Sequence, residues 1–134
     1  MKAEAVNMWR RGLAEFFGTA LMVGVGCGSI AMGASHTMVS LSFGIAVTAA
    51  ILIFQPISGA HINPAVSIAF FRTGHLEKRA LFPYILAQLS GASVAAFFLQ
   101  GVGPTRRAAD VSIYTGGLIE VFITFSLMAS IYLI

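Results

Sequence analysis

Four residues with special backbone or hydrogen-bonding properties stand close together in an otherwise apolar stretch: Gly59, His61, Asn63 and Pro64. Asparagine is a preferred helix N-cap, and proline fits the first helical position, where its missing N–H costs nothing. We therefore expect a helix to begin at Asn63. Its side-chain oxygen would accept a backbone N–H, which leaves the NH₂ group free to donate into a pore. Such a donor orients a small polar molecule such as water.

The helix that begins there is too short to cross a bilayer. It is expected to run from Pro64 to about Phe71, which gives roughly 12–15 Å at about 1.5 Å per residue. The hydrocarbon core of a bilayer is about 30 Å thick. The start of this helix would then lie near the membrane midplane, after non-helical backbone from Pro56 to Ile62. Such backbone is tolerated there only beside a cavity or inside protein, so we expect a re-entrant loop over residues 56–71 beside a pore.

Further candidate pore groups lie on both sides of the cap. The carbonyls of Gly59, Ala60 and His61, in extended backbone, would form a ladder of acceptors for a single file of water. His61 is either a pore ligand or, in the interpretation that we prefer, a structural residue that braces the loop. Pro64 and Ala65 fix a helix start whose positive dipole end disfavours cations and protons. The plainer alternative is an ordinary capped helix in a kinked span.

Two acidic residues, Glu15 and Glu120, lie inside apolar stretches, where such groups are costly and usually functional. A proton relay is one interpretation. We prefer a structural one, in which each carboxylate accepts hydrogen bonds from backbone donors of a non-helical pore loop. Gln88 either helps in the same way or makes a polar contact between helices.

Composition places these residues in a membrane. The chain has 134 residues, of which 57% are hydrophobic and 10% charged, as in a polytopic membrane protein without room for a second domain. The net charge of +3 does not indicate nucleic-acid binding, because the basic residues stand at the ends of apolar stretches. His36, His61 and His75 lack metal-ligand spacing, and no nucleophile–base pair or cofactor loop is present, so we expect no metal, no cofactor and no enzyme.

The apolar stretches predict an all-α membrane protein. We expect transmembrane helices over residues 13–32, 39–54, 80–99 and 116–134, with Gln55-Pro56 ending the second.

The positions of the basic residues favour the re-entrant interpretation. If the loop returns to the side that it left, six basic residues share one face and two lie on the other; if it crosses, the split is five against three. The positive-inside rule prefers the first division, which puts the N-terminus in the cytoplasm, most simply at a plasma or inner membrane, and loop 100–115 outside. The six are Lys2, Arg10, Arg11, Arg72, Lys78 and Arg79, and the two are Arg106 and Arg107.

Residues 12–19 and 117–124 form an internal repeat. Five of their eight positions are identical, and the acids Glu15 and Glu120 correspond. After three crossings the second copy starts on the opposite face from the first, which is an inverted-topology repeat of the kind common in transport proteins.

The repeat divides the chain into two parts of unequal completeness. Residues 1–115 form a first repeat of three transmembrane helices and the re-entrant loop, and residues 116–134 form the first helix of a second repeat. A matching asparagine would stand 105 positions after Asn63, beyond the 134 residues. We therefore expect about half of a larger channel plus one helix, truncated after the fourth transmembrane helix.

The stretch Ser58–Val66 resembles the first signature loop of the major intrinsic proteins, the aquaporins and aquaglyceroporins. Ala14–Thr19 is similar to the first helix of that family and Leu86–Leu89 to its third, so the resemblance covers the whole chain. It implies an aquaporin-like bundle of six spanning helices, two half-helices that meet at mid-membrane, and homotetramers with one pore per subunit. The fifth and sixth helices, the second signature loop and the pore arginine of the family are absent from these residues.

The resemblance also implies roles for single residues. Phe43 falls where the family places an aromatic side chain in the narrow outer ring, and phenylalanine there is typical of water-selective members, whereas glycerol-conducting ones often carry tryptophan. A lipid-facing or core-facing phenylalanine is the alternative. The family's equivalents of Glu15 and Glu120 are thought to brace the pore loops.

The predicted function is a passive channel in a lipid bilayer for water and small uncharged solutes such as glycerol, which excludes ions and protons. The alternative is a non-conducting fragment that acts only as an assembly piece.

Overall fold

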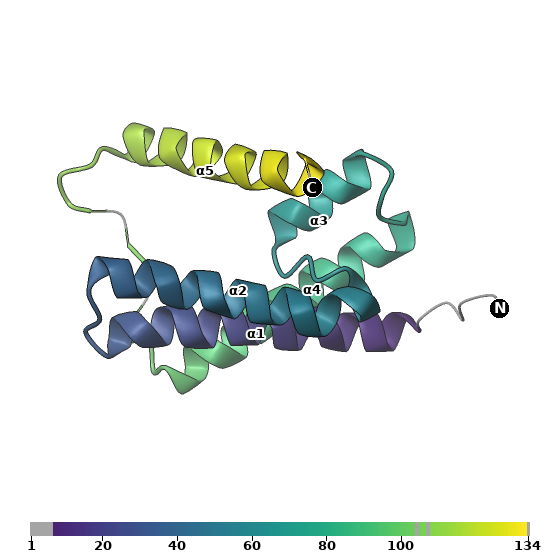
Figure 1. Cartoon of the computed structure of the whole chain (residues 1–134), viewed down its shortest axis with the longest axis horizontal. Helices are drawn as coiled ribbons and strands as arrows, with labels where there is room; N and C mark the ends of the chain where they lie inside the picture. The colour runs from purple at the N-terminus through teal and green to yellow at the C-terminus, as the bar shows by residue number, and fades with distance from the viewer. Residues whose placement is uncertain (1–6, 104, 107, 134) are drawn as a thin grey trace. The chain divides into compact units, whose positions relative to one another are not determined.

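The computed structural model describes residues 7–103, 105–106 and 108–133. Lys2 and Arg107, which enter the charge count above, and Ile134, the predicted end of the fourth span, lie outside these residues. All regular secondary structure in the described part is helical (Figure 1). The five helices are α1 (Met8–Ala31), α2 (His36–Ser58), α3 (Pro64–Arg72), α4 (Lys78–Phe98) and α5 (Ile113–Leu133).

Four of these helices are long and apolar enough to cross a membrane. They are α1, α2, α4 and α5, with 24, 23, 21 and 21 residues. At about 1.5 Å per residue each reaches or exceeds the roughly 30 Å of a hydrocarbon core. In contrast, α3 has nine residues and a length of about 13 Å. The expectation of an all-α, multi-pass integral membrane protein is confirmed.

The first helix begins five residues earlier than predicted. The side chain of Asn7 accepts a hydrogen bond from the Trp9 N–H at 3.1 Å and caps the helix at Met8. The cap lets the polar residues before Leu13 join the helix, with Trp9 71% exposed at its first turn. The third and fourth spans likewise begin two or three residues before their predicted starts.

The predicted end of the second helix at Gln55-Pro56 is wrong, because α2 continues to Ser58. Pro56 cannot donate to the backbone carbonyl four residues earlier, so α2 passes through it with one internal hydrogen bond fewer. Gly59 then closes the helix in the left-handed region, at φ 89°, with its N–H on the Gln55 carbonyl at 2.9 Å. The non-helical segment is therefore residues 59–63, shorter than the predicted 56–62 at its start.

The chain divides into two compact units, residues up to 104 and residues from 105. In the first unit α1 packs against both α2 and α4, and α3 packs against α4 (Figure 1). The approach of α1 to α4 is close at Gly91, where an added Cβ would clash with the Phe16 carbonyl oxygen. The second unit consists of the segment before α5 and α5 itself.

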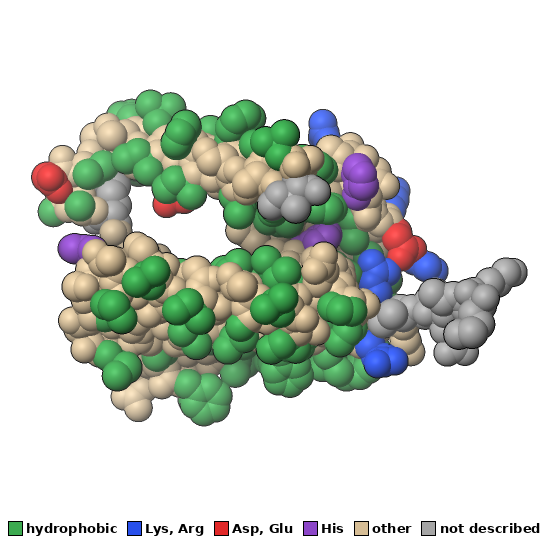
Figure 2. Space-filling model, in the orientation of Figure 1, with side chains coloured by type: hydrophobic (Ala, Val, Ile, Leu, Met, Phe, Trp, Pro, Cys, Tyr) green, Lys and Arg blue, Asp and Glu red, His purple; other side chains and the backbone are tan. Residues whose placement is uncertain are grey.

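The surface of the first unit is apolar along its helices and charged at one end. Figure 2 shows basic side chains gathered at the end where α1 begins, while apolar side chains cover much of the helical faces. Arg10, Arg72, Lys78 and Arg79 are exposed, and Arg11 is half-buried. A band of exposed apolar side chains with charges at its end is what a lipid-facing bundle requires.

Candidate functional site

Residues 59–63, between α2 and α3, are held in an unusual backbone conformation. Ala60 and Ile62 have φ values of 49° and 45°, and Gly59 has 89°. A non-glycine residue in the left-handed region costs on the order of 1–3 kcal/mol and persists only where its surroundings impose it. The expectation of extended backbone over Gly59–His61 is thus wrong for Gly59 and Ala60. The segment turns sharply because α3 must start inside the unit rather than continue α2.

The carboxylate of Glu15, on α1, makes four hydrogen bonds to the residues around this segment. Its Oε1 accepts from the Ser58 hydroxyl at 2.6 Å and from the His61 N–H at 2.9 Å. Its Oε2 accepts from the Ile62 N–H at 2.6 Å and from Gln88 Nε2 at 2.7 Å. Glu15 is fully buried, and an ionised carboxylate is an acceptor only, so all four donors suit it. Two of these donors are backbone groups that no helix satisfies.

Gln88 and Ser67 extend the network from Glu15 to α3. Gln88 Nε2 donates to the Ser67 hydroxyl at 2.9 Å as well as to Glu15, so both of its amide protons are used. The Ser67 oxygen lies 3.1 Å from His61 Nδ1. Ser67 and Gln88 are 0% and 1% exposed. Ser67 escaped the sequence analysis, although a serine one turn after the Asn63 cap, in an apolar half-helix, is a detectable signal.

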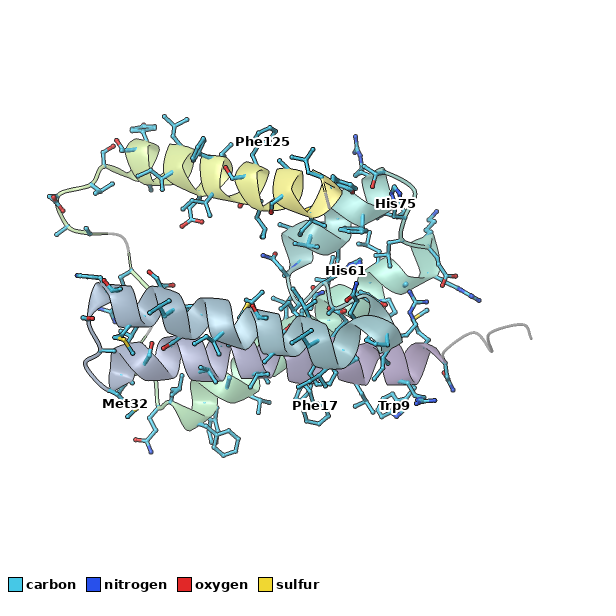
Figure 3. All side chains as sticks on the ribbon, viewed as in Figure 1. Trp9, Phe17, Met32, His61, His75 and Phe125 are labelled. Carbon is cyan, nitrogen blue, oxygen red and sulfur yellow. The ribbon has the colours of Figure 1, made fainter. Side chains whose placement is uncertain are left out.

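His61 lies at the junction of the loop with α3 and α4 (Figure 3). Its ring centroid is 4.6 Å from that of Phe70 and 5.3 Å from that of Tyr84. With 7% of its surface exposed and Nδ1 next to Ser67, the side chain is packed within the protein. This environment favours the structural interpretation of His61 over the pore ligand.

Asn63 caps α3 with its side-chain oxygen. Oδ1 accepts from the Ala65 N–H at 2.8 Å, and the Asn63 carbonyl accepts from the Ser67 N–H at 3.1 Å. Pro64 occupies the first helical position. Among the described residues the NH₂ group of Asn63 has no hydrogen-bond partner, and the residue is half-buried. The cap therefore leaves an amide donor available at the start of the half-helix.

One predicted site residue, Phe43, lies away from this cluster, and another, Glu120, belongs to the second unit. Phe43 packs its ring on Gly26 of α1, where any Cβ would clash with it. It precedes Ser58 on α2 by about 22 Å at 1.5 Å per residue, so it sits toward the other end of that helix. Glu120 lies on α5, in the second unit, with an exposed side chain. Its role in bracing a second loop stays a prediction.

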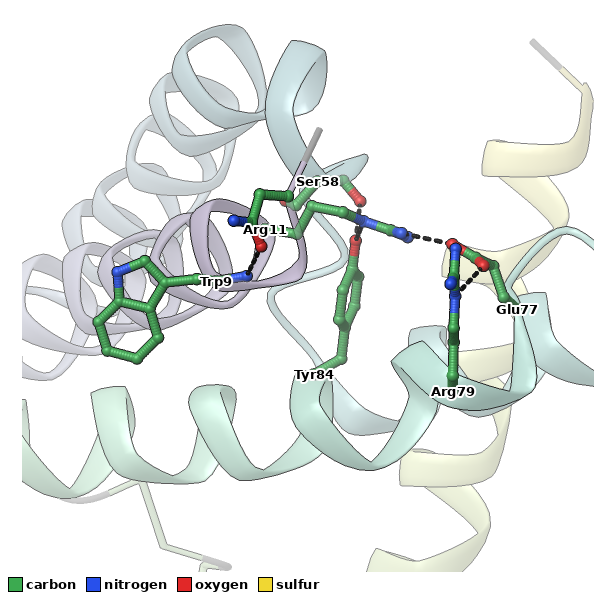
Figure 4. Close-up of polar contacts among 7 residues, drawn as sticks. Trp9, Arg11, Ser58, Glu77, Arg79 and Tyr84 are labelled. Atoms are coloured by element: carbon green, nitrogen blue, oxygen red, sulfur yellow. Dashed lines mark hydrogen bonds and ion pairs between the residues drawn. The ribbon is translucent and has the colours of Figure 1, made fainter. Parts of the chain in front are cut away.

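The start and the end of the segment 59–77 lie at the same end of the first unit. The Tyr84 hydroxyl donates to the Ser58 carbonyl at 2.6 Å (Figure 4). Arg11 Nε in turn donates to the Tyr84 hydroxyl at 2.8 Å. Arg11 also pairs with Glu77, which precedes α4, at 2.6 Å. The chain thus leaves α2 and enters α4 beside the second turn of α1, and α3 lies on the excursion between them.

A charged cluster surrounds a cavity at this end. Hydrogen bonds from Arg11 first, and then from Arg79, hold the pKa of the Glu77 carboxyl below its ordinary value. Together with Arg79 the cluster carries two guanidinium groups for one carboxylate. The cavity measures about 670 Å³, room for many water molecules at about 30 Å³ each. Its lining consists of Asn7, Met8, Arg11, Ile57, Ser58, Glu77 and Arg79.

The fold and the site define an all-helical, multi-pass integral membrane protein whose half-helix is capped by Asn63 and tied to a buried glutamate, Glu15. A model of the family described as "Major intrinsic protein" matches residues 2–134. The chain belongs to the major intrinsic protein family, as the resemblance of its loop predicted.

Several curated proteins are similar to the chain. Aquaporin AqpM of Methanothermobacter marburgensis is 34% identical over 160 residues, which cover 94% of this chain and 65% of that protein. The lens fiber major intrinsic protein of Rattus norvegicus is 35% identical, over 96% of this chain and 54% of its own length. Aquaporin NIP1-1 of Zea mays is 35% identical, over 87% of this chain and 45% of its own length. The chain spans between 45% and 65% of the length of these three relatives.

Proposed function

We propose that this chain is part of a passive membrane channel for water and small uncharged solutes such as glycerol, and that residues 59–67 line half of the path. One observation carries the proposal: the amide donor of Asn63 stands without a partner among the described residues, at the start of a helix only nine residues long. The family supports it, because two of the three relatives above are named aquaporins.

The proposed role of Asn63 is to orient the permeating molecule. A water molecule that passes the NH₂ group accepts from it and must turn its own oxygen toward α3. The N-terminus of α3 carries roughly half a positive charge, which repels cations and opposes the passage of protons. Pro64 and Ala65 hold this helix start in place, and the backbone carbonyls of Gly59, Ala60 and His61 supply acceptors along the same path.

The proposed orientation places the N-terminus in the cytoplasm, at a plasma or inner membrane. The basic residues of the first unit gather where α1 begins. Arg72 and Lys78 flank residues 73–77, and the last of these, Glu77, pairs with Arg11 of α1. Because basic residues are enriched on the cytoplasmic side, this end faces inward, and the 670 Å³ cavity beside Arg11 becomes the inner entrance of the path.

Further parts of the proposal concern the complete channel. Phe43, toward the end of α2 opposite Ser58, is proposed to belong to a narrow outer ring that favours water over larger solutes. Residues 1–115 form one repeat with a re-entrant loop, and residues 116–134 begin a second, inverted one whose Glu120 braces a second loop. The assembled protein is proposed to be a homotetramer with one pore in each subunit and to have no enzymatic activity.

The experiment that tests the site uses a conducting protein in proteoliposomes. Residues 1–134 are joined in aligned register to the C-terminal part of the archaeal relative, and water flux and cation leak are recorded by stopped-flow light scattering and by a cation-sensitive dye. Asn63→Asp keeps the N-cap but replaces the amide donor with an acidic acceptor. We expect lower water flux and a measurable cation leak.

The matched control is Ser35→Asp, which likewise places an acid at a helix N-cap, at the exposed start of α2 and outside the proposed path. It should leave water flux and cation exclusion as in the parent protein. If both variants behave alike, Asn63 does not act on the permeating molecule. A non-conducting parent that inserts and folds would favour an assembly role instead.

A further inference from the structure

Ser58, the last residue of α2, is hydrogen-bonded through its side chain and through its carbonyl. Its hydroxyl donates to Glu15 at 2.6 Å and accepts from the Ala60 N–H at 3.0 Å. Its carbonyl oxygen accepts from Tyr84 Oη at 2.6 Å. The last carbonyls of a helix have no partner within it, so Tyr84 supplies a donor that α2 cannot. The residue is held from α1 through its side chain and from α4 through its backbone.

Arg11 determines where the Tyr84 proton points. Arg11 Nε lies 2.8 Å from Tyr84 Oη, and a guanidinium group can only donate (Figure 4). The hydroxyl therefore accepts from Arg11 and directs its single proton to the Ser58 carbonyl. Tyr84 is 0% exposed and packs with Leu76 and Ala80, so its hydroxyl cannot turn to water. The Arg11 guanidinium also lies 5.2 Å from the centre of the Tyr84 ring, within the range of a cation–π contact.

Two polar links connect α1 with α4, one turn apart. Arg11 is hydrogen-bonded to Tyr84, and Glu15 to Gln88. Arg11 and Glu15 are four residues apart on α1, as are Tyr84 and Gln88 on α4, so each pair shares one face of its helix. Both links end on the loop. The first reaches the carbonyl of Ser58, and the second reaches its hydroxyl together with two backbone amides beyond it. Tyr84 thus fixes the point from which the left-handed turn departs, whereas Glu15 fixes the turn itself.

We propose that Tyr84 is a positioning residue of the pore loop and that Arg11 acts through it. The role in a pore rests on the proposed function; the anchoring of residues 58–62 does not. The ion pair of Arg11 with Glu77 is secondary, because the Glu77 side chain is 43% exposed and pairs of this kind contribute little. Loss of the Tyr84 hydroxyl leaves the Ser58 carbonyl without its donor and loosens the backbone that leads to Asn63.

The test is amide hydrogen exchange of the full chain in detergent micelles, read by mass spectrometry. Tyr84→Phe removes one hydroxyl and keeps the ring in its packed site. Exchange of the segment 59–63 should rise roughly fivefold, the change that corresponds to one typical hydrogen bond, with circular dichroism unchanged. Tyr114→Phe, at an exposed tyrosine of α5, is the matched control and should leave this segment as it is. Unchanged exchange at 59–63 in Tyr84→Phe overturns the proposal.

A second pair of variants tests whether Arg11 acts through Tyr84. Arg11→Met in the parent chain should raise exchange of residues 59–63, and in the Tyr84→Phe background it should add nothing further. Arg10→Met, which removes an exposed neighbouring cation, is the control. An undiminished effect of Arg11→Met in the double variant overturns the assignment of Arg11.

Water flux through the joined, conducting protein then separates this proposal from the channel proposal. The hydrogen-exchange measurement does not require a conducting protein. It therefore tests whether Tyr84 anchors the loop even if the protein conducts nothing. Where the parent conducts, Tyr84→Phe should lower flux while Tyr114→Phe does not. Unchanged flux in Tyr84→Phe despite faster exchange overturns the positioning role in the pore.

Discussion

The carboxylate of Glu15 and the backbone N–H of Ile62, 47 residues apart in the chain, form a hydrogen bond of 2.6 Å. Ile62 occupies the left-handed region at φ 45°, a conformation that a β-branched residue adopts only under constraint. The constraint comes from a charge buried on the first helix. The Glu15 side chain thus ties the irregular segment to α1, and the half-helix begins two residues later.

The first prediction concerns the replacement of this acid. Glu15→Gln keeps one acceptor oxygen and most of the shape, whereas Glu15→Leu leaves the His61 and Ile62 amides unpaired at about 1–3 kcal/mol each. Glu15→Leu should therefore lower the thermal midpoint in detergent far more than Glu15→Gln. Glu77→Leu, at an exposed acid, is the control and should have a small effect. Equal stability of Glu15→Leu and the parent would show that the carboxylate does not brace the loop.

The second prediction concerns the contact of α1 with α4. A Cβ added at Gly91 would clash with the Phe16 carbonyl, and a backbone atom cannot move aside without moving its helix. Gly91→Ala should lower the thermal midpoint and weaken the Glu15–Gln88 link. Gly12→Ala meets no atom within 4 Å and replaces glycine in a helix, so it should be neutral or slightly stabilising. A Gly91→Ala protein as stable as the Gly12→Ala protein would contradict the close packing.

The third prediction concerns acid. Hydrogen bonds from Arg11 and Arg79 lower the pKa of Glu77 below its ordinary value of 4.5. For a carboxyl with a lowered pKa, the stabilisation is present above the ordinary value and is lost as pH falls through the lowered one. The difference in thermal midpoint between the parent and Glu77→Gln should be small at pH 7, should begin to shrink below pH 4.5, and should vanish only once the pH is below the lowered pKa of Glu77. A difference that grows toward acid would have the wrong sign for this ion pair.

The fourth prediction concerns topology. With Cys27→Ala as background, His75→Cys places a thiol at an exposed position between α3 and α4, and Thr105→Cys places one at an exposed position before α5. In intact cells an impermeant maleimide should label the cysteine at 105 and not the one at 75. Labelling at 75 from outside would mean that the segment 59–77 does not return to the cytoplasmic face.

The sequence was most informative where one residue has one dominant physical preference. Asn63 and Pro64 identified the start of α3, because few residues suit the N-cap as well as asparagine does, and few suit the first helical position as well as proline does. The buried charge of Glu15 required partners, and the nearby irregular segment had donors to offer. The predicted end of α2 is two to three residues early because a proline favours a helix end without requiring one, and the extent of the last turn depends on tertiary contacts at Ser58.

The contacts of Arg11, Tyr84 and Ser67 could not be predicted from the sequence. Arg11 and Tyr84 are 73 residues apart, and each has an ordinary local role, as a basic residue at a membrane interface or an aromatic residue in a helix. Their pairing depends on the crossing of α1 and α4, which is set by packing at Gly91 rather than by either residue. Ser67 faces Gln88 only because α3 turns back toward α4.

The most direct test of the central claim is stopped-flow light scattering on two proteins, residues 1–134 alone and the same residues joined to the C-terminal part of the archaeal relative. The described residues hold one half-helix, capped by Asn63, and in the proposed channel they line one half of the water path. We predict little flux above empty liposomes for residues 1–134, and fast flux with a low activation energy for the joined protein. Fast, low-activation-energy flux through residues 1–134 alone, or none through a folded joined protein, would contradict the account.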